Sequence, residues 1–502
     1  MVALISKETY NRKKLFLVAN GWMLAMIVAA LLLGIAVHFR LCSKRRLRAE
    51  PWNVDRLVAA TTVVLFFLQC YFAYNIFFLT DWDVQTLIHC AQNATAGGWH
   101  ETDWWYYSVY PNNLFITFFY AVVLKINCAV GIFNQEYATM SIVVVNCLVN
   151  AFSCWLVYKT AGLFVEKKLA FFGYCLVVLS VGLSSWTVIC YSDSLVLFVP
   201  VLSTYLYLKP HKNRWCRGLY RLSAVAIAMI GYYVKPTCAI VLIAIVLIEV
   251  ADLVWNPRMN KAVRLAALCV AIVVAGCCAN TLMNLGVQRL DGSLNKNATY
   301  GASHFLMMGL NEESQGTYSS KDVKYSGSFG TAQERTAANL RMVKYRLRQM
   351  GMGGLLRHLH NKLLITFNDG TFAWGQEGTF YKWIPENLND RAAPLLKAIY
   401  YNSGRYYGYL STMQQLVWLA ILLLSLASVF LEKRLRPEKP LPVLWLTILG
   451  FVAYELLFEI RARYVYIFVP VFCVLASVGL ENILHLAGNA LGKEPKWSLF
   501  CT

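Results

Sequence analysis

Apolar runs separated by short polar segments dominate the chain from one end to the other. A run of about 20 apolar residues is long enough to cross a bilayer as a helix. Alternating segments of about ten residues, the pattern of a transmembrane barrel, do not occur, so only helices can satisfy a backbone in lipid. The pattern predicts an all-α polytopic membrane protein with about 11 to 13 transmembrane helices. The longest runs cover 15–37, 57–79, 114–133, 138–158, 169–189, 236–254, 265–286, 416–431, 441–458 and 465–486.

Composition and charge agree with this class of protein. Hydrophobic residues make up 58% of 502, and 46 Lys and Arg against 27 Asp and Glu give a net charge of +19. The basic residues cluster in short loops between apolar runs, where the positive-inside rule explains them without a nucleic-acid partner. These predicted cytoplasmic loops are 40–48, 159–168, 209–221, 257–264 and 432–439.

The number of spans between residues 114 and 208 depends on one interrupted run. The basic loop at 159–168 belongs to the cytoplasm only if one of the runs around it is incomplete. We expect the break at Lys125, Ile126 and Asn127, which returns Asp193 to the external side. Asp193 is then either a site residue or the N-cap of a helix over 194–208, a position that Asp favours.

A polar, aromatic segment at 79–113 interrupts the apolar pattern directly after the second run. Its sequence, LTDWDVQTLIHCAQNATAGGWHETDWWYYSVYPNN, places Asp81 and Asp83 at the water–lipid boundary. Carboxylates among Trp and Tyr are typical of a sugar or headgroup site, although solvated loop charges and an interfacial aromatic belt would give the same composition. Apolar spacing at 84–94 before Gly97 and Gly98 predicts a short helix that begins near Asp83.

This segment resembles the first external loop of the GT-C superfamily of polyprenyl-phosphate-sugar glycosyltransferases, which includes protein O-mannosyltransferases and the lipid A aminoarabinose transferase. It is more similar to a bacterial, family 39-like group that carries Trp-Asp followed by YPNN or YPNQ, here Trp82-Asp83 and YPNN at 110–113. The resemblance implies a GT-C-like bundle with an external loop domain and one extra span ahead of it. It also implies that Asp83 is catalytic and that Tyr110 and Asn112 bind substrate.

Further stretches resemble the same group in the same order. They are YYVKPT around Lys235, HFLMMGLN at 304–311 and NDGTFAW at 368–374. The charged ExRxRY turn EIRARY at 459–464 is similar to an arginine-tyrosine turn near the end of GT-C members. The resemblance implies donor-phosphate binding by Lys235, Arg461 and Arg463, and substrate binding by Asp193, His304, Asn311 and Asp369. Two alternatives remain open: Lys235 as a snorkelling interfacial lysine, and an ion pair between Glu459 and Arg463 at i, i+4.

The pattern divides the chain into four parts: 1–56, an extra span and a basic cytoplasmic loop; 57–286, a GT-C-like membrane module with its catalytic loop at 80–113; 287–412, an external domain; and 413–502, the last membrane helices. Within the external domain, 332–349 reads as a cationic amphipathic helix. It has either a solvated face or a face on the anionic membrane surface.

These features predict an inverting glycosyltransferase in the cell membrane, with its active site on the extracytoplasmic side. Asp83 would take the acceptor proton and the cations would stabilise the departing phosphate, with no cofactor required. Asp81 leaves open which carboxylate is the base and whether the two hold a divalent cation. The partners would be a polyprenyl-phosphate-linked sugar, membrane lipids and an envelope glycan, lipid or protein acceptor. The rival functions are a flippase of lipid-linked sugars and a ligase or polymerase with a pyrophosphate-linked donor.

Overall fold

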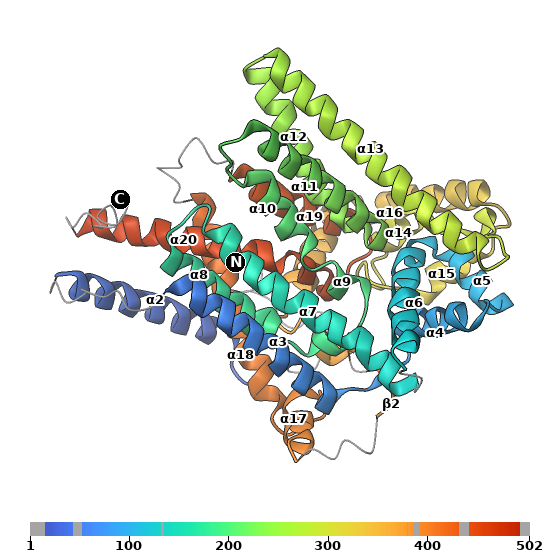
Figure 1. The fold of residues 1–502 in the computed structure, drawn as a ribbon, viewed down its shortest axis with the longest axis horizontal. Coiled ribbons are helices and arrows are strands. Elements are labelled where there is room, and N and C mark those ends of the chain that lie inside the picture. Colours follow the sequence, from blue (N-terminus) through green and yellow to red (C-terminus); the bar gives the residue numbers. More distant parts are fainter. Residues whose placement is uncertain are drawn as a thin grey trace.

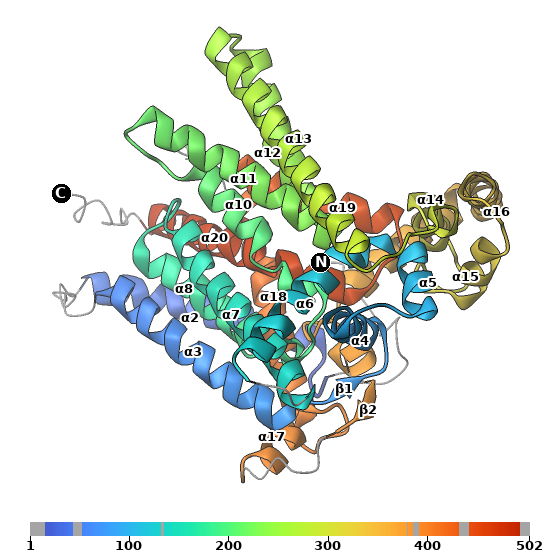
Figure 2. The same ribbon diagram turned by 45° about the vertical axis from the view of Figure 1, so that its right-hand side comes forward.

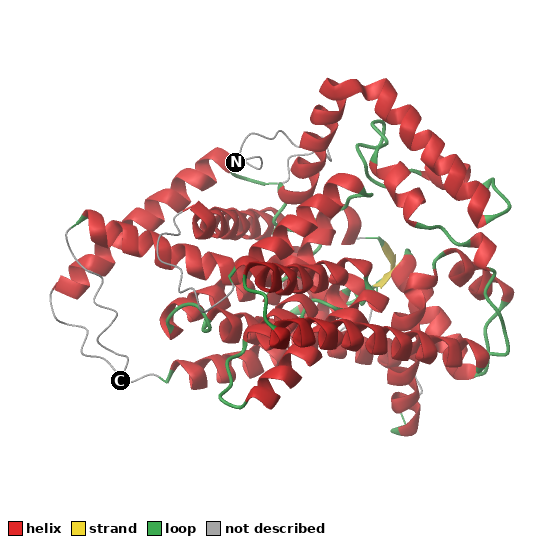
Figure 3. Ribbon diagram, turned by 90° about the horizontal axis from the view of Figure 1, so that it is seen from above, coloured by secondary structure: helices red, strands yellow, loops and turns green. Residues whose placement is uncertain are grey.

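The computed structural model describes residues 16–43, 53–131, 135–378, 380–384, 391–430 and 441–491. These residues are almost entirely helical, as Figure 3 shows. The described strands are β1 (Leu79–Thr80) and β2 (Tyr381–Trp383), which pair in an antiparallel two-stranded ribbon. The expected all-α class is therefore confirmed. The predicted basic loop at 432–439 and most of the loop at 40–48 lie outside the described residues.

Eight helices among the described residues are long and apolar enough to span a bilayer. They are α2 (Asn20–Ser43), α3 (Val54–Ile76), α6 (Leu114–Ala129), α7 (Gln135–Ala161), α12 (Ala239–Trp255), α13 (Met259–Gln288), α18 (Tyr407–Phe430) and α20 (Val469–Ala490). Two shorter apolar helices are α10 (Val199–Leu208) and α19 (Pro442–Leu457), and α8 (Lys167–Val177) and α11 (Arg214–Val234) complete the bundle. The total of about 11 to 13 spans stays a prediction, because short and interrupted helices fall outside a length criterion.

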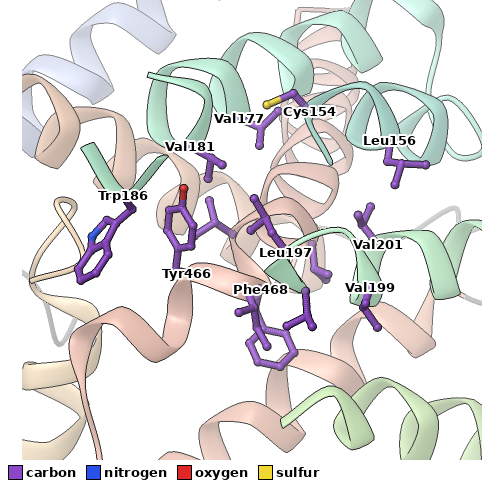
Figure 4. Packing of buried hydrophobic residues seen from close by; sticks show 14 of the residues in the cluster. Cys154, Leu156, Val177, Val181, Trp186, Leu197, Val199, Val201, Tyr466 and Phe468 are labelled. Atoms are coloured by element: carbon purple, nitrogen blue, oxygen red, sulfur yellow. The ribbon is translucent and has the colours of Figure 1, made fainter. Parts of the chain in front are cut away.

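Helix α20 runs through the centre of the bundle, where it packs against α18, α8 and α7 (Figures 1 and 2). Gly479 of α20 meets the backbone of α18 at Leu424, and Gly173 of α8 meets Ser477. Such small residues let helices approach closely, which is the usual basis of helix packing in lipid. Figure 4 shows side chains of α7, α8 and α10 meeting Tyr466 and Phe468 just ahead of α20.

The interruption between residues 114 and 208 lies in the apolar run at 169–189. The expected break at Lys125–Asn127, in the run at 114–133, is therefore wrong. Helix α6 is continuous from Leu114 to Ala129, because this stretch has no Pro or Gly and the Lys125 side chain is exposed. The break follows α8, in a π turn at η2 (Val178–Gly182) and a 3-10 turn at η3 (Ser185–Val188).

Polar side chains of neighbouring helices satisfy the backbone of this broken run. The amide of Gln69 donates to the Gly182 carbonyl at 2.7 Å, and that of Asn146 donates to the Thr187 carbonyl at 2.7 Å. Irregular backbone inside a membrane bundle requires such partners. The break leads directly into Tyr191 and α9 (Ser192–Leu195), and it therefore positions one wall of the site.

The remaining helices lie mainly at one end of the bundle, as Figure 2 shows for α4, α5, α14, α15 and α16. Their bounds are α4 (Asp83–Ala96), α5 (Glu101–Val109), α14 (Ala302–Gly309), α15 (Ser320–Gly327), α16 (Ala332–Phe367) and α17 (Ala393–Tyr400). Helix α4 begins at Asp83, which confirms the predicted short helix.

Helix α16 shows only part of the expected cationic face. Arg335 and Arg346 point inward: Arg335 donates to backbone carbonyls such as that of Ser326, and Arg346 pairs with Asp322 at 2.6 Å. A fully solvated face is therefore wrong for these two arginines. They donate hydrogen bonds to residues of α14 and α15 and so join both helices to α16. The exposed cations are Arg341, Lys344 and Arg348.

Candidate functional site

Asp83 is the first residue of α4, and the ribbon of β1 and β2 fixes the chain just before it. A helix start favours a negative charge, because its free N–H groups carry the positive end of the helix dipole. The half-buried Asp83 carboxylate accepts a hydrogen bond of 3.1 Å at Oδ2 from the Tyr191 hydroxyl. The Trp82 ring packs edge-on against the Tyr191 ring, with 5.0 Å between centroids.

Asp81 lies beside Asp83 in sequence but has a different environment. Its backbone N–H donates to the Phe380 carbonyl at 3.2 Å, and its exposed carboxylate lies 3.3 Å from the Lys382 ammonium. Among the residues that the structure describes, no group of three or more His, Cys, Asp or Glu side chains is arranged to hold a metal ion. A divalent cation shared by Asp81 and Asp83 stays an untested prediction.

Arg463 links the Asp83 segment to a buried cluster of charges. Its guanidinium lies over the Trp82 ring, 4.6 Å from the centroid, and 5.4 Å from the Tyr191 centroid. Its Nε lies 3.5 Å from Asp193 Oδ2, and its Nη1 donates to Glu377 Oε2 at 2.9 Å. The predicted arginine therefore reaches the tryptophan next to the predicted base.

Lys235 lies at the end of α11 and completes the cluster from the other side. Its Nζ is 2.5 Å from Asp193 Oδ1 and 4.4 Å from the Tyr464 ring centroid, and the residue is 8% exposed. Burial beside a carboxylate excludes the snorkelling alternative. Asp193 does not cap a helix over 194–208 either, because it lies inside α9, where Tyr191 is the N-cap, and its carboxylate faces Lys235 and Arg463.

Arg461 pairs with two carboxylates. Its Nη1 donates to Glu377 Oε1 at 3.1 Å, and its Nε lies 3.4 Å from Glu459 Oε1. The alternative ion pair of Glu459 with Arg463 is wrong, because the extended backbone at Arg461 breaks the helical i, i+4 spacing. Burial raises the pKa of Glu459, and the neighbouring Arg461 and Arg463 oppose that shift.

The YPNN stretch at 110–113 contacts Tyr106, which lies against Asp83. Burial, together with the charges of Asp83 and Glu459, raises the pKa of Tyr110, whose ring lies 5.4 Å from that of Tyr106. The predicted substrate residue Asn112 is exposed, whereas its neighbour Asn113 is buried and donates to the Tyr106 hydroxyl at 2.8 Å. Tyr106 in turn lies against Asp83, and the burial of its phenol together with this carboxylate raises the pKa of Tyr106.

Three predicted substrate residues form internal hydrogen bonds instead of facing Asp83. His304 Nδ1 lies 2.7 Å from the Ser326 hydroxyl, and burial lowers the pKa of His304 to about 4. The Asn311 amide donates to Asp322 at 3.0 Å. Asp369 accepts bonds of 2.7 Å from the backbone and hydroxyl of Thr371 and 3.0 Å from the Ala373 N–H, and thereby shapes the turn that leads to Glu377. Their substrate contacts stay predictions.

The stretch at 304–311 holds in place the turn at 459–464 that carries Arg461 and Arg463, which we call the arginine turn. A side chain at Gly309 would overlap the Phe458 carbonyl, and the Glu459 N–H donates to the Phe305 carbonyl at 3.0 Å. The buried ammonium of Lys362 donates to the carbonyls of Gly309, at 2.9 Å, and Phe458, at 2.8 Å. These contacts explain how a stretch distant from Asp83 in sequence helps to position the arginines of the site.

Sequence reasoning did not find Glu377, Tyr191 or Lys362. Glu377 follows the NDGTFAW stretch by three residues and Tyr191 precedes Asp193 by two, which are the only local signals for them. Lys362 lies in a helix whose other basic residues are mostly exposed, so nothing in its sequence context marks it as buried. The contacts of all three join segments far apart in the chain.

The apolar helices and their buried polar contacts define a polytopic helical membrane protein. Residues 2–484 match the model of the family described as conserved hypothetical integral membrane protein, and the chain belongs to this family. A search of curated proteins finds no match. These findings confirm the predicted integral membrane protein, and membership of the bacterial YPNN group stays a prediction.

Among solved structures, the chain is similar to the archaeal oligosaccharyltransferase AglB from Archaeoglobus fulgidus, determined in complex with an inhibitory peptide and a dolichol-phosphate. The similarity has a TM-score of 0.37 and 12% sequence identity, and it covers 84% of this chain and 53% of that one. The chain thus spans about half the length of the structure that it matches.

Proposed function

We propose that this protein is a membrane glycosyltransferase that moves a sugar from a polyprenyl-phosphate donor to an acceptor outside the cytoplasm. One observation supports this proposal above the others: Arg463 lies 4.6 Å from the centroid of Trp82, the residue next to Asp83, and shares a buried cluster with Arg461 and Lys235. A candidate base and fixed cations are therefore connected through Trp82 and Tyr191. General-base transfer from a phosphate-linked sugar requires this pair of functions.

The proposed reaction is a single displacement. The acceptor hydroxyl attacks the anomeric carbon, its proton passes to the Asp83 carboxylate, and the bond between the anomeric carbon and the phosphate oxygen breaks. The leaving lipid phosphate keeps the electron pair, and Arg461, Arg463 and Lys235 stabilise its added negative charge. The anomeric configuration is inverted. Tyr191 orients Asp83 through its hydrogen bond, and Asp193 orients Lys235 and Arg463.

The sidedness of the reaction follows from charge. The basic loops at 209–221 and 257–264 face the cytoplasm under the positive-inside rule, which leaves the Asp83 end of the bundle outside. The acceptor is then a cell-envelope glycan, lipid or protein, and the donor enters from the membrane. A half-buried Asp83 suits this arrangement, because the carboxylate must remain reachable by an acceptor from water.

The test uses the full-length protein in liposomes with a radiolabelled polyprenyl-phosphate hexose and an envelope extract as acceptor. We expect label in the acceptor with the wild-type protein and its loss with Asp83→Asn, while Asp81→Asn, which tests the alternative base, should retain most of the transfer. Movement of the donor between leaflets without transfer would assign the flippase function instead. Transfer only from a pyrophosphate-linked donor would assign the ligase or polymerase function.

A further inference from the structure

Glu377 bridges the two arginines of the cluster with its two carboxylate oxygens. Oε1 accepts from Arg461 Nη1 at 3.1 Å and Oε2 accepts from Arg463 Nη1 at 2.9 Å, while the side chain is only 4% exposed. Arginine binds carboxylate and phosphate oxygens with the same planar, paired geometry. Glu377 therefore occupies the position that a phosphate would take between these two guanidinium groups.

The charges around Glu377 are already balanced without a ligand. Besides Glu377, the cations Arg461, Arg463 and Lys235 contact the carboxylates of Asp193 and Glu459. Among the side chains in direct contact, three positive groups thus face three negative ones, and the buried Lys362 and Glu455 beside them add one basic and one acidic group. An added phosphate would leave an uncompensated negative charge there, which is strongly unfavourable in a poorly solvated environment. One carboxylate has to leave when a phosphate binds.

Glu377 is the carboxylate of the three that bridges Arg461 and Arg463. Asp193 lies between Lys235 and Arg463 inside α9, and Glu459 is fixed by its backbone bond to Phe305. Glu377 instead lies in a turn at η6 (Trp374–Gly378).

Two residues other than glycine adopt positive φ angles just before this turn. Phe372 has a φ of 55° and Ala373 a φ of 60°, both in the left-handed region. Such conformations are sparsely populated for residues with a side chain and persist only under local constraint, here the bonds from Asp369. The backbone of this turn is therefore fixed, so the movement that frees the two arginines is a change in the Glu377 side chain.

We propose that Glu377 holds the donor-phosphate seat on Arg461 and Arg463 in the donor-free protein and leaves it when the donor binds. This inference rests on the proposed function. Replacing one carboxylate by one singly charged phosphodiester keeps the cluster neutral, whereas a pyrophosphate-linked lipid brings an extra negative charge. Glu377 therefore competes with the donor phosphate, and the single excess positive charge that it leaves behind favours a phosphodiester-linked sugar over a pyrophosphate-linked one.

The test compares two probes, a polyprenyl-phosphate hexose and a polyprenyl-pyrophosphate hexose, on the full-length protein in nanodiscs. Glu377→Gln keeps the size and one hydrogen-bond acceptor but removes the charge. We expect it to bind both probes about tenfold more tightly than wild type, because Glu377 no longer competes for the two arginines, and to keep the preference for the phosphodiester probe. Glu377→Asp keeps the charge but is too short to bridge both arginines, so it should tighten binding less and retain the wild-type preference.

Glu313→Gln is the matched control, because Glu313 is an exposed carboxylate that pairs with Lys321 instead of the arginines and should leave both affinities unchanged. Weaker or unchanged binding by Glu377→Gln, with wild-type binding intact, would make Glu377 a structural support of the arginines and overturn this inference alone. Failure of the wild-type protein to bind either probe would overturn the proposed function together with it.

Discussion

The Tyr191 hydroxyl donates a hydrogen bond of 3.1 Å to Asp83 Oδ2 across 108 positions of sequence. The bond exists because the apolar run at 169–189 breaks at 178–188 and turns the chain back toward the start of α4. Arg463 lies over the ring of Tyr191 and over that of Trp82, the residue before Asp83. The first loop, the broken helix and the arginine turn thus form one site.

Asp83→Asn should lower turnover by about 100-fold or more, because the amide keeps the size of the carboxylate but cannot accept a proton. The Tyr191 bond to the side-chain oxygen survives, so the protein should fold and bind donor normally. Turnover and donor affinity are measured separately on the purified protein. Asp81→Asn should have a mild effect, since Asp81 is exposed and faces Lys382. Full activity of Asp83→Asn with an inactive Asp81→Asn would transfer the base to Asp81.

Tyr191→Phe removes the hydroxyl that orients Asp83 and leaves the ring that packs on Trp82. One hydrogen bond is worth about 1 kcal/mol, so we expect kcat to fall about fivefold with the donor KM unchanged. Steady-state kinetics with both substrates separate these quantities. Tyr345→Phe is the control, because the Tyr345 ring is exposed on α16. A kcat equal to that of wild type would show that Asp83 needs no help from Tyr191.

Arg461→Ala should weaken donor use by about ten- to a hundredfold, because a charged hydrogen bond to a partly dehydrated phosphate contributes roughly 1.5 to 3 kcal/mol. Arg461 is the cleaner choice of the two arginines. Removing Arg463 would take one cationic partner from both Asp193 and Glu377, which would keep Lys235 and Arg461, and would also lower Tm. The readouts are the donor KM and Tm, with Arg348→Ala on the exposed face of α16 as control. An unchanged donor KM would remove Arg461 from the site.

Local patterns in the sequence predicted the parts of the site that depend on local forces. Apolar spacing and an acidic start placed a helix at Asp83, and α4 begins there. The position of Lys235 between two apolar runs marked it as exceptional, and the structure pairs it with Asp193. The break was misplaced because Lys125 is the more obvious polar residue, whereas the actual break depends on buried amides such as Gln69 in another helix.

The features of the site that the sequence does not predict depend on contacts between residues far apart in the chain. Glu377 contacts Arg461 across 84 positions, and no spacing rule links the two. The stretch at 304–311 was assigned to substrate binding, but its visible contacts hold the arginine turn through Gly309 and Lys362. Which charges meet inside a bundle depends on how its helices pack, and a single sequence carries little of that information.

Cysteine labelling tests the topology. A cysteine at Glu313 should react with a membrane-impermeant reagent in intact cells, and one at Lys212 should react only after permeabilisation, because both side chains are exposed but at sites predicted on opposite sides of the membrane. The nearby Gly316 is a poor position for an introduced cysteine, since it has a φ of 79° and a Cβ there would lie 2.9 Å from the Gly309 carbonyl oxygen. Labelling is measured against the parent with its 15 native cysteines. The reverse pattern of labelling would invert the proposed orientation.

His304 should make the folded protein less stable in acid. Burial lowers the pKa of His304 to about 4, from the 6.5 of an unperturbed histidine. Between these values the unfolded chain binds a proton that the folded protein does not, so stability present above pH 6.5 is lost as the pH falls toward 4. The loss amounts to about 3 kcal/mol at most.

The measurement is the Tm of the detergent-solubilised, full-length protein at pH 7.5 and pH 5. His304→Gln should start from a lower Tm, because the bond to Ser326 is altered, but should lose less on acidification than wild type. His89→Gln is the control, since His89 is exposed on α4 and should keep the wild-type acid sensitivity. His358 is also buried with a lowered pKa, so some acid sensitivity should remain in His304→Gln. An identical drop in Tm for wild type and His304→Gln would show that His304 is protonated in the folded protein as readily as in the unfolded chain.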